Sequence, residues 1–137
     1  MTPTPDIPIA NPHGKREFIM IVDDDALIRP LLGHLLTKEG YRVVSACDGP
    51  HALEIYKYIY DQIQLVILDF NMPGMDGFVL FGELQLINPQ VVAVLTSGVI
   101  QEEKLKEMMG KGLRGFMQKP LTQQKLLQNV RAILDAV

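Results

Sequence analysis

Apolar residues along the chain form five short runs, and each run is followed by a segment whose apolar residues recur at helical spacing. The first run, residues 18–22, ends in three aspartates, and the helical pattern after it closes at Gly40. The predicted strands span 18–22, 41–46, 65–69, 91–96 and 115–118. Runs without polar alternation are typical of parallel strands that are buried on both faces. The pattern therefore predicts an α/β protein.

Apolar and aromatic side chains of the first two helical segments are expected to face the core. They are Leu27, Ile28, Leu31, Leu32, Leu35 and Leu36 in the first segment, and Ala52, Leu53, Tyr56, Ile59 and Tyr60 in the second. Five βα units are too few to close a barrel, so they predict an open, doubly wound sheet. Residues 1–17 contain four of the nine prolines and little apolar periodicity, which predicts a flexible proline-rich tail or linker before a domain at 18–137.

Composition narrows the function classes. The 137 residues are 47% hydrophobic and 21% charged, which is ordinary for one globular domain with its own core. A net charge of −3 without a run of lysines or arginines disfavours direct nucleic-acid binding. The single cysteine, Cys47, allows no internal disulfide, and no apolar stretch is long enough to span a membrane. A cytoplasmic protein is therefore expected.

Chemistry-bearing side chains follow four of the predicted strands. They are Asp23, Asp24 and Asp25 after the first strand, Asp69 after the third, Ser97 after the fourth and Lys119 after the fifth. Because parallel strands end at the same edge of a sheet, these side chains are expected to meet there. Clustered carboxylates repel one another unless a hard divalent cation neutralises them, and Mg²⁺ suits an open site with few carboxylates. A lysine and a hydroxyl beside such a cluster favour phosphoryl transfer onto a carboxylate.

Several motifs together resemble the receiver domain of response regulators in two-component signalling. They are the acidic pair Asp23-Asp24, the segment LDFNMPGMDG around Asp69, the hydroxyl after the fourth strand, Gly115-Phe116 and Lys119-Pro120. The resemblance covers residues 18–137 and implies a flavodoxin-like (βα)5 sheet with strand order 2-1-3-4-5. It also implies a phosphoacceptor signalling domain rather than an enzyme, which is phosphorylated by a histidine kinase or a phosphotransfer protein. Self-association through the fourth helix, fifth strand and fifth helix is a further expectation.

The resemblance also assigns roles to single residues. Asp69 is the expected phosphoacceptor, and Lys119 is expected to pair with the phosphoryl group. Mg²⁺ is expected to be bound by Asp24, Asp69 and the backbone carbonyl of Asn71, with Asp23 acting through water. Ser97 and Phe116 are the expected switch residues, and Asn71 and Val99 are expected to tune dephosphorylation. Val99 has no polar group to orient a water, which predicts a long-lived phosphoaspartate. The Lys119-Pro120 bond is a candidate cis peptide.

Thr96 and Ser97 are neighbouring hydroxyls, and only one of them can face Asp69, because successive strand residues point to opposite faces. Counted back from Lys119, Ser97 keeps the spacing of the family without an insertion, whereas Thr96 does not. Ser97 is therefore the predicted switch residue, and Thr96 is the second choice.

Two other function classes remain as alternatives. One is a receiver-like interaction module that takes no phosphate, although none of Asp24, Asp69, Ser97 and Lys119 is missing. The other is a phosphatase of the haloacid-dehalogenase type, which needs the pattern Asp-X-Asp-X-Thr after the first strand. Here Leu27 stands where that threonine belongs. Asp25 and Asp76 are expected to cap helices rather than to bind metal. Receivers occur both alone and attached to sensor kinases, so a fragment of a larger protein is also compatible with this sequence.

Overall fold

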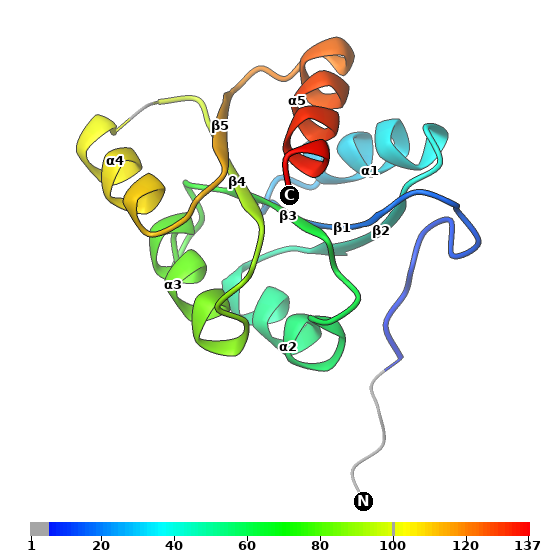
Figure 1. Cartoon of the computed structure of the whole chain (residues 1–137), viewed down its shortest axis with the longest axis horizontal. Helices are drawn as coiled ribbons and strands as arrows, with labels where there is room; N and C mark the ends of the chain where they lie inside the picture. The colour runs from blue at the N-terminus through cyan, green and yellow to red at the C-terminus, as the bar shows by residue number, and fades with distance from the viewer. Residues whose placement is uncertain (1–5, 100) are drawn as a thin grey trace, which may run out of the picture.

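The computed structural model describes residues 6–99 and 101–137, and over these residues five strands alternate with five helices (Figure 1). The strands are β1 (Phe18–Val22), β2 (Arg42–Ala46), β3 (Leu65–Asp69), β4 (Ala93–Ser97) and β5 (Gly115–Gln118). The helices are α1 (Ile28–Lys38), α2 (Gly49–Ile59), α3 (Gly77–Ile87), α4 (Glu102–Gly110) and α5 (Gln123–Asp135). The predicted alternation is confirmed, with boundaries that shift by one or two residues at several ends.

All neighbouring strands pair in parallel, in the order β2-β1-β3-β4-β5, so the predicted doubly wound sheet and its strand order are confirmed. Helices α1 and α5 cover one face, while α2, α3 and α4 cover the other (Figure 1). Alternate residues of β3 supply the two cores: Val66 and Leu68 pack on the side of α2 and α3, and Leu65 and Ile67 on the side of α1 and α5. Burial on both faces explains why the strands are continuously apolar.

Residues 6–17, which belong to the proline-rich tail or linker predicted for residues 1–17, contact the domain at several points. Residues 1–5 of that prediction lie outside the described residues. The backbones of Ala10 and Val43 form an antiparallel bridge, with N–H to O distances of 2.8 and 3.1 Å. Ile7 and Ile9 pack against the core on the α2 side, and the side-chain amide of Asn11 donates to the Tyr41 carbonyl at 3.1 Å.

This bridge occupies the free edge of β2. The same edge is occupied further along at Cys47, whose backbone N–H donates to His51 Nδ1 at 3.2 Å. Sequence periodicity missed the segment because a single bridge and two isoleucines produce neither a strand nor a helix pattern. Hydrogen bonds to the edge strand β2 offset the conformational entropy that the segment before β1 loses when it becomes ordered. The few apolar residues of this segment could not offset that loss by themselves.

Three residues that the sequence pattern predicts to lie in the core are exposed in the structure. Leu27 is 83% exposed because it lies in the turn before α1, and Leu31 is exposed because α1 turns Leu32 and Leu36 toward the sheet instead. Tyr60 is exposed because it follows the last residue of α2. No helix within the described residues combines the length and the apolarity that crossing a bilayer requires.

An ion pair ties the residue before β1 to the last helix. Arg131 of α5 donates from both terminal nitrogens to the Glu17 carboxylate, at 3.2 and 2.6 Å, and one of these nitrogens also bonds the Tyr41 hydroxyl at 3.1 Å. The hydrogen bond from Arg131 holds the pKa of the Glu17 carboxyl below its ordinary value. A two-pronged guanidinium–carboxylate contact of this kind is stronger than a single surface ion pair.

Replacing Glu17 with glutamine is expected to lower the free energy of unfolding by about 1 kcal/mol at neutral pH. Since the folded pKa of Glu17 is lowered, this stabilisation is present above the unfolded pKa and is lost as the pH falls through the folded pKa. Urea unfolding of wild type and variant from neutral to acidic pH measures the difference. The matched control is Asp135→Asn, which removes an exposed i,i+4 partner of Arg131 and should cost less than about 0.5 kcal/mol. Equal losses in the two variants would contradict the prediction.

Candidate functional site

Two carboxylates are buried where β1 and β3 end. Val22 of β1 pairs with Leu68 of β3, so Asp23 and Asp69 follow side by side at the carboxyl edge of the sheet. Their exposed fractions are only 1% and 4%. Asp24 is exposed beside them, and one carboxylate oxygen from each of the three aspartates lies within 4.8 Å of the others. The structure thus brings together the three acidic residues predicted for this site.

Lys119 supplies the positive charge in this cluster. Its Nζ donates to Asp23 Oδ2 at 3.0 Å and lies 3.3 Å from Asp69 Oδ2. The lysine follows β5, its backbone N–H donates to the Ser97 carbonyl at 2.8 Å, and the Lys119-Pro120 peptide is cis as predicted. One lysine against three carboxylates leaves the site with an excess of negative charge.

The environment changes the protonation behaviour of Asp69 and Lys119. Burial, together with the nearby Asp23 charge, raises the pKa of Asp69 to about 6, although Lys119 and the backbone amide of Asn71 act in the opposite direction. Burial alone would lower the pKa of Lys119, but the hydrogen bond and charge of Asp23, reinforced by Asp69, outweigh it and raise that pKa. Near neutral pH Lys119 is therefore protonated and Asp69 is mostly ionised, and Asp69 gains a proton when the pH falls below about 6.

The donor set fits a hard divalent cation. Carboxylate oxygens are the preferred ligands of Mg²⁺ and Ca²⁺, and the excess negative charge of buried Asp23 and Asp69 is what such an ion would neutralise. Asp24, which is exposed, offers an oxygen at the solvent side of the cluster. The acidic pocket could therefore bind a metal.

The two neighbouring hydroxyls of β4 lie on different sides, as predicted. Ser97 Oγ accepts from Asn71 Nδ2 at 3.2 Å and donates to the Val99 carbonyl at 2.7 Å, so it lies on the side of the loop after β3. Thr96 Oγ1 instead donates to the Leu68 carbonyl at 3.5 Å and is buried within the sheet. Ser97 is thus the hydroxyl that is adjacent to the acidic cluster through Asn71.

Phe116 and Val99 lie on the α4 side of this hydroxyl. The Phe116 ring is partly buried and lines a small cavity that Ser97, Val99 and Leu105 also line. The side chain of Val99 is exposed. Both residues are close enough to Ser97 to be affected by a change in its hydrogen bonds.

The loops around the cluster are held by caps and by one contact that the sequence did not indicate. Asp25 Oδ1 accepts from the backbone N–H of Leu27 and Ile28 in the turn before α1, but the N-cap residue of α1 is Leu27 and not Asp25 as expected. Asp76 caps α3, as expected. Arg29 was not predicted to contribute. Its guanidinium donates to the backbone carbonyl of Asp23 at 2.7 Å and thereby fixes the acidic loop. Its position in the first turn of the helix after the aspartates is the only signal in the sequence.

Comparison with known proteins identifies the family. The model of the response regulator receiver domain matches residues 19–131, which is most of the chain. The chain belongs to the response regulator receiver family. The resemblance to this family that the sequence motifs indicated is therefore confirmed. The alternative of a haloacid-dehalogenase-type phosphatase has no support from the comparisons.

Relatives of this receiver include both short and long proteins. The chemotaxis protein CheY of Treponema pallidum is 31% identical over 124 residues, covering 90% of this chain and 86% of the relative. The sensor kinase CckA of Brucella abortus is 28% identical over 117 residues, which cover 85% of this chain but 12% of the kinase. Receiver domains of this kind therefore occur alone and within larger proteins.

Solved structures confirm the fold of the receiver. In the CheX-CheY-BeF3-Mg²⁺ complex from Borrelia burgdorferi, the matching chain is 30% identical and superposes with a TM-score of 0.82, covering 90% of this chain and 98% of the other. The order of the five strands and the arrangement of the helices on both faces agree with this assignment.

Proposed function

We propose that this receiver accepts a phosphoryl group on Asp69 from the phosphohistidine of a histidine kinase or a phosphotransfer protein. The observation that carries the proposal is the contact between Asp69 and Lys119, at 3.3 Å, inside a cluster of three carboxylates at the end of β3. A carboxylate can act as the nucleophile in phosphoryl transfer when the charge that develops on the phosphoryl oxygens is stabilised.

In the proposed reaction an oxygen of Asp69 forms the new bond to phosphorus. The bond between phosphorus and the imidazole nitrogen of the donor breaks, and its electron pair stays on that nitrogen. Lys119, which in this structure is shared between Asp23 and Asp69, turns its Nζ toward a phosphoryl oxygen. A bound Mg²⁺ would supply further charge stabilisation, held by Asp24, Asp69 and the backbone carbonyl of Asn71, with Asp23 acting through water.

The transferred group adds about −2 of charge and new acceptor oxygens at one edge of the sheet. Ser97 Oγ, which now donates to the Val99 carbonyl, has a stronger acceptor available on the phosphoryl group. Its movement would release the contacts around α4 and let Phe116 turn inward, so that the α4–β5–α5 face changes its shape for a partner or a second copy. Direct binding to nucleic acid or to a membrane is not part of this proposal, and the setting is a cytoplasmic phosphorelay.

Residues beside the site set the lifetime of the phosphoaspartate. Asn71 and Val99 are both exposed, and both hydrogen-bond Ser97 Oγ, Asn71 through its side-chain amide and Val99 through its backbone. Hydrolysis needs a water aligned with the phosphorus, and the apolar Val99 side chain offers no hydrogen bond to hold one. We therefore expect slow dephosphorylation.

Intact-mass measurement after incubation with Mg²⁺ and acetyl phosphate tests the proposal. The wild type is expected to gain one phosphoryl group, which hydroxylamine removes, and Asp69→Asn is expected to gain none. The control is Asp76→Asn, whose carboxylate caps α3 and lies outside the cluster, so this variant should still be labelled. The loss of label after removal of the donor measures its lifetime. Absence of any adduct, with small donors and with kinases, would favour the phosphate-independent interaction module.

A further inference from the structure

Helix α4 has the fewest buried residues of the five helices. Of its nine residues, all of which the structure describes, only Met108 is buried, whereas four residues of α3 are buried. Figure 1 shows α4 at the outer end of the layer that it forms with α2 and α3. A helix with so few buried residues opens at a lower cost in free energy than the rest of the domain. Contacts outside the core therefore have a large influence on the position of α4.

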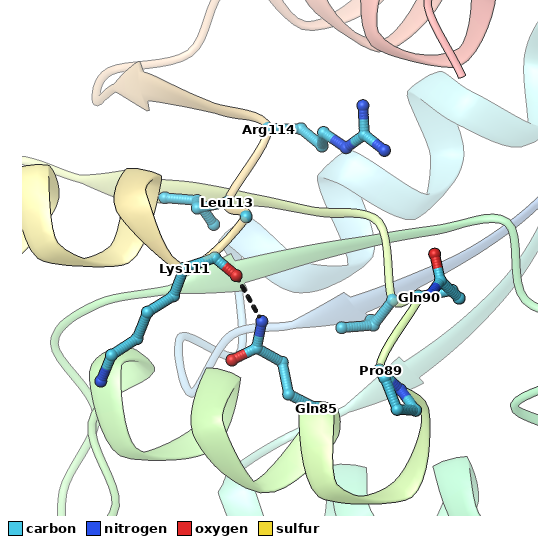
Figure 2. Close-up of a pocket in the computed structure, with 8 residues that line it drawn as sticks. Gln85, Pro89, Gln90, Lys111, Leu113 and Arg114 are labelled. Atoms are coloured by element: carbon cyan, nitrogen blue, oxygen red, sulfur yellow. Dashed lines mark hydrogen bonds between the residues drawn. The ribbon is translucent and has the colours of Figure 1, made fainter.

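The C-terminal end of α4 is attached to α3. The side-chain amide of Gln85 donates to the carbonyl of Lys111, the C-cap residue of α4, at 2.7 Å (Figure 2). In the same view the Lys111 side chain extends beside α3 and away from the pocket that the two residues line. Its amine lies 5.1 Å from the centre of the Phe78 ring of α3. A hydrogen bond and an aromatic contact therefore hold this end of the helix.

The N-terminal end of α4 contacts its surroundings through Lys104. The N-cap residue, Gln101, makes no side-chain capping hydrogen bond with any described residue. Lys104, in the first turn, places its Nζ 5.6 Å from the centre of the Phe70 ring and 5.6 Å from that of Phe78. A lysine ammonium within about 6 Å of a ring centre is attracted to the negative face of the ring. The two rings therefore attract this end of the helix.

Lys104 has no competing partner of opposite charge. Among the residues that the structure describes it takes part in no ion pair, whereas Lys111 lies 3.9 Å from the Glu107 carboxylate. Lys106, another exposed lysine of α4, takes part in neither an ion pair nor a cation–π contact within the described part of the chain. The two lysines therefore differ in their aromatic contacts, and Lys106 offers a matched control for Lys104.

Phe70 connects this contact to the phosphoacceptor site. It follows Asp69 directly in the chain, and its side chain is buried. Phe70 also lines the small cavity next to Ser97 and Phe116, which Leu105 of α4 lines as well. A shift of α4 away from Phe70 would therefore enlarge the cavity beside the two predicted switch residues.

We infer that Lys104 is a positioning residue that holds the N-terminal end of α4 on two aromatic rings, and that this contact opposes the conformation that phosphorylation favours. The helix then turns about its C-terminal end, which the hydrogen bond from Gln85 to Lys111 holds. The inference rests on the proposed phosphorylation of Asp69 and names a contact that the switch must break. A cation–π contact of an exposed lysine changes an equilibrium by about two- to fivefold.

Hydrogen–deuterium exchange without any phosphodonor tests the contact itself. Lys104→Gln removes the charge and keeps a good helix former, so amides around Leu105 are expected to exchange about two- to fivefold faster than in the wild type. Lys106→Gln is the matched control and should exchange as the wild type does. Lys104→Arg retains a cation and should also behave as the wild type. Equal exchange in Lys104→Gln and the wild type would overturn the inference.

Binding of beryllofluoride with Mg²⁺, a non-covalent substitute for the phosphoryl group, tests the link to the switch. The affinity of Lys104→Gln, followed by fluorine NMR, is expected to be about two- to fivefold higher than that of the wild type, because a contact that opposes the bound conformation is already removed. Lys106→Gln should bind as the wild type does. A purely structural role of Lys104 would leave the affinity unchanged or lower it, and that result would overturn the inference.

The two measurements also separate this inference from the proposed function. Lack of beryllofluoride binding to every variant and to the wild type would contradict the proposed phosphorylation of Asp69. The exchange rates would still decide whether Lys104 holds α4, because they are measured without a phosphodonor. Binding to the wild type with no difference in Lys104→Gln would support the phosphoacceptor site and overturn the role of Lys104.

Discussion

The Asp69→Asn variant is expected to be more stable than the wild type at neutral pH in the absence of divalent cations, by about 1 to 3 kcal/mol. The reason is the raised pKa of Asp69, about 6 in the folded protein against 3.8 as its ordinary value, which burial causes first and the Asp23 charge second. Burial of the ionised Asp69 carboxylate lowers the free energy of unfolding, whereas burial of a neutral amide of the same shape has a smaller cost. Urea unfolding of both proteins at pH 7 measures the difference.

The pH dependence gives a second check on the same variant. The folded protein holds its proton on Asp69 more tightly than the unfolded chain does, so the stabilisation present below about pH 4 is lost as the pH rises to about 6. The stability difference between variant and wild type should therefore grow over this range and then level off. Addition of Mg²⁺ should stabilise the wild type more than the variant, because the bound ion neutralises the carboxylates. A difference that does not change with pH would contradict the assigned role of burial.

Gly77→Ala is expected to destabilise the domain by about 2 kcal/mol or more and to impair phosphorylation of Asp69 as well. A Cβ atom at Gly77 would lie 2.7 Å from the Asp69 carbonyl oxygen and 2.9 Å from the Phe70 Cα. These atoms belong to the backbone at the end of β3 and cannot rotate away. The strand end that carries the phosphoacceptor must therefore shift, or α3 must begin elsewhere. Urea unfolding and the rate of labelling by acetyl phosphate measure the two effects.

Gly33→Ala is the matched control for this substitution. A Cβ atom at Gly33, in the middle of α1, would meet its nearest neighbour, Val43 Cγ1, at 3.9 Å, which is an ordinary contact. Alanine favours a helix interior over glycine by up to about 1 kcal/mol, so this variant should be at least as stable as the wild type. If Gly77→Ala were equally harmless, the close approach of α3 to β3 would not constrain the site.

The parallel sheet and the clustering of the acidic side chains could be predicted from the sequence, because both depend on strong local patterns. Each strand is a short apolar run that ends in a polar residue, and parallel pairing brings those ends to one edge. The choice of Ser97 over Thr96 depended on strand alternation and on spacing from Lys119. The hydrogen bonds of the two hydroxyls agree with it.

Features that depend on three-dimensional neighbours could not be predicted. The bridge between Ala10 and Val43 needs a free sheet edge, which the sequence does not display. The sharing of Lys119 between Asp23 and Asp69 depends on distances of a few ångströms at the end of β5. The exposure of Leu31 depends on which stripe of α1 packs on the sheet, and in the structure Leu32 and Leu36 take the buried positions.

The covered edge of β2 affects how the protein behaves at high concentration. An unpaired edge strand is a template onto which a strand of another molecule can add, and this addition leads to aggregation. Here the backbone groups of Val43 are taken by Ala10, and the N–H of Cys47 is taken by His51. An incoming strand would have to displace both contacts before it could pair. The segment before β1 therefore makes the outer edge of β2 a poorer template for the addition of a strand.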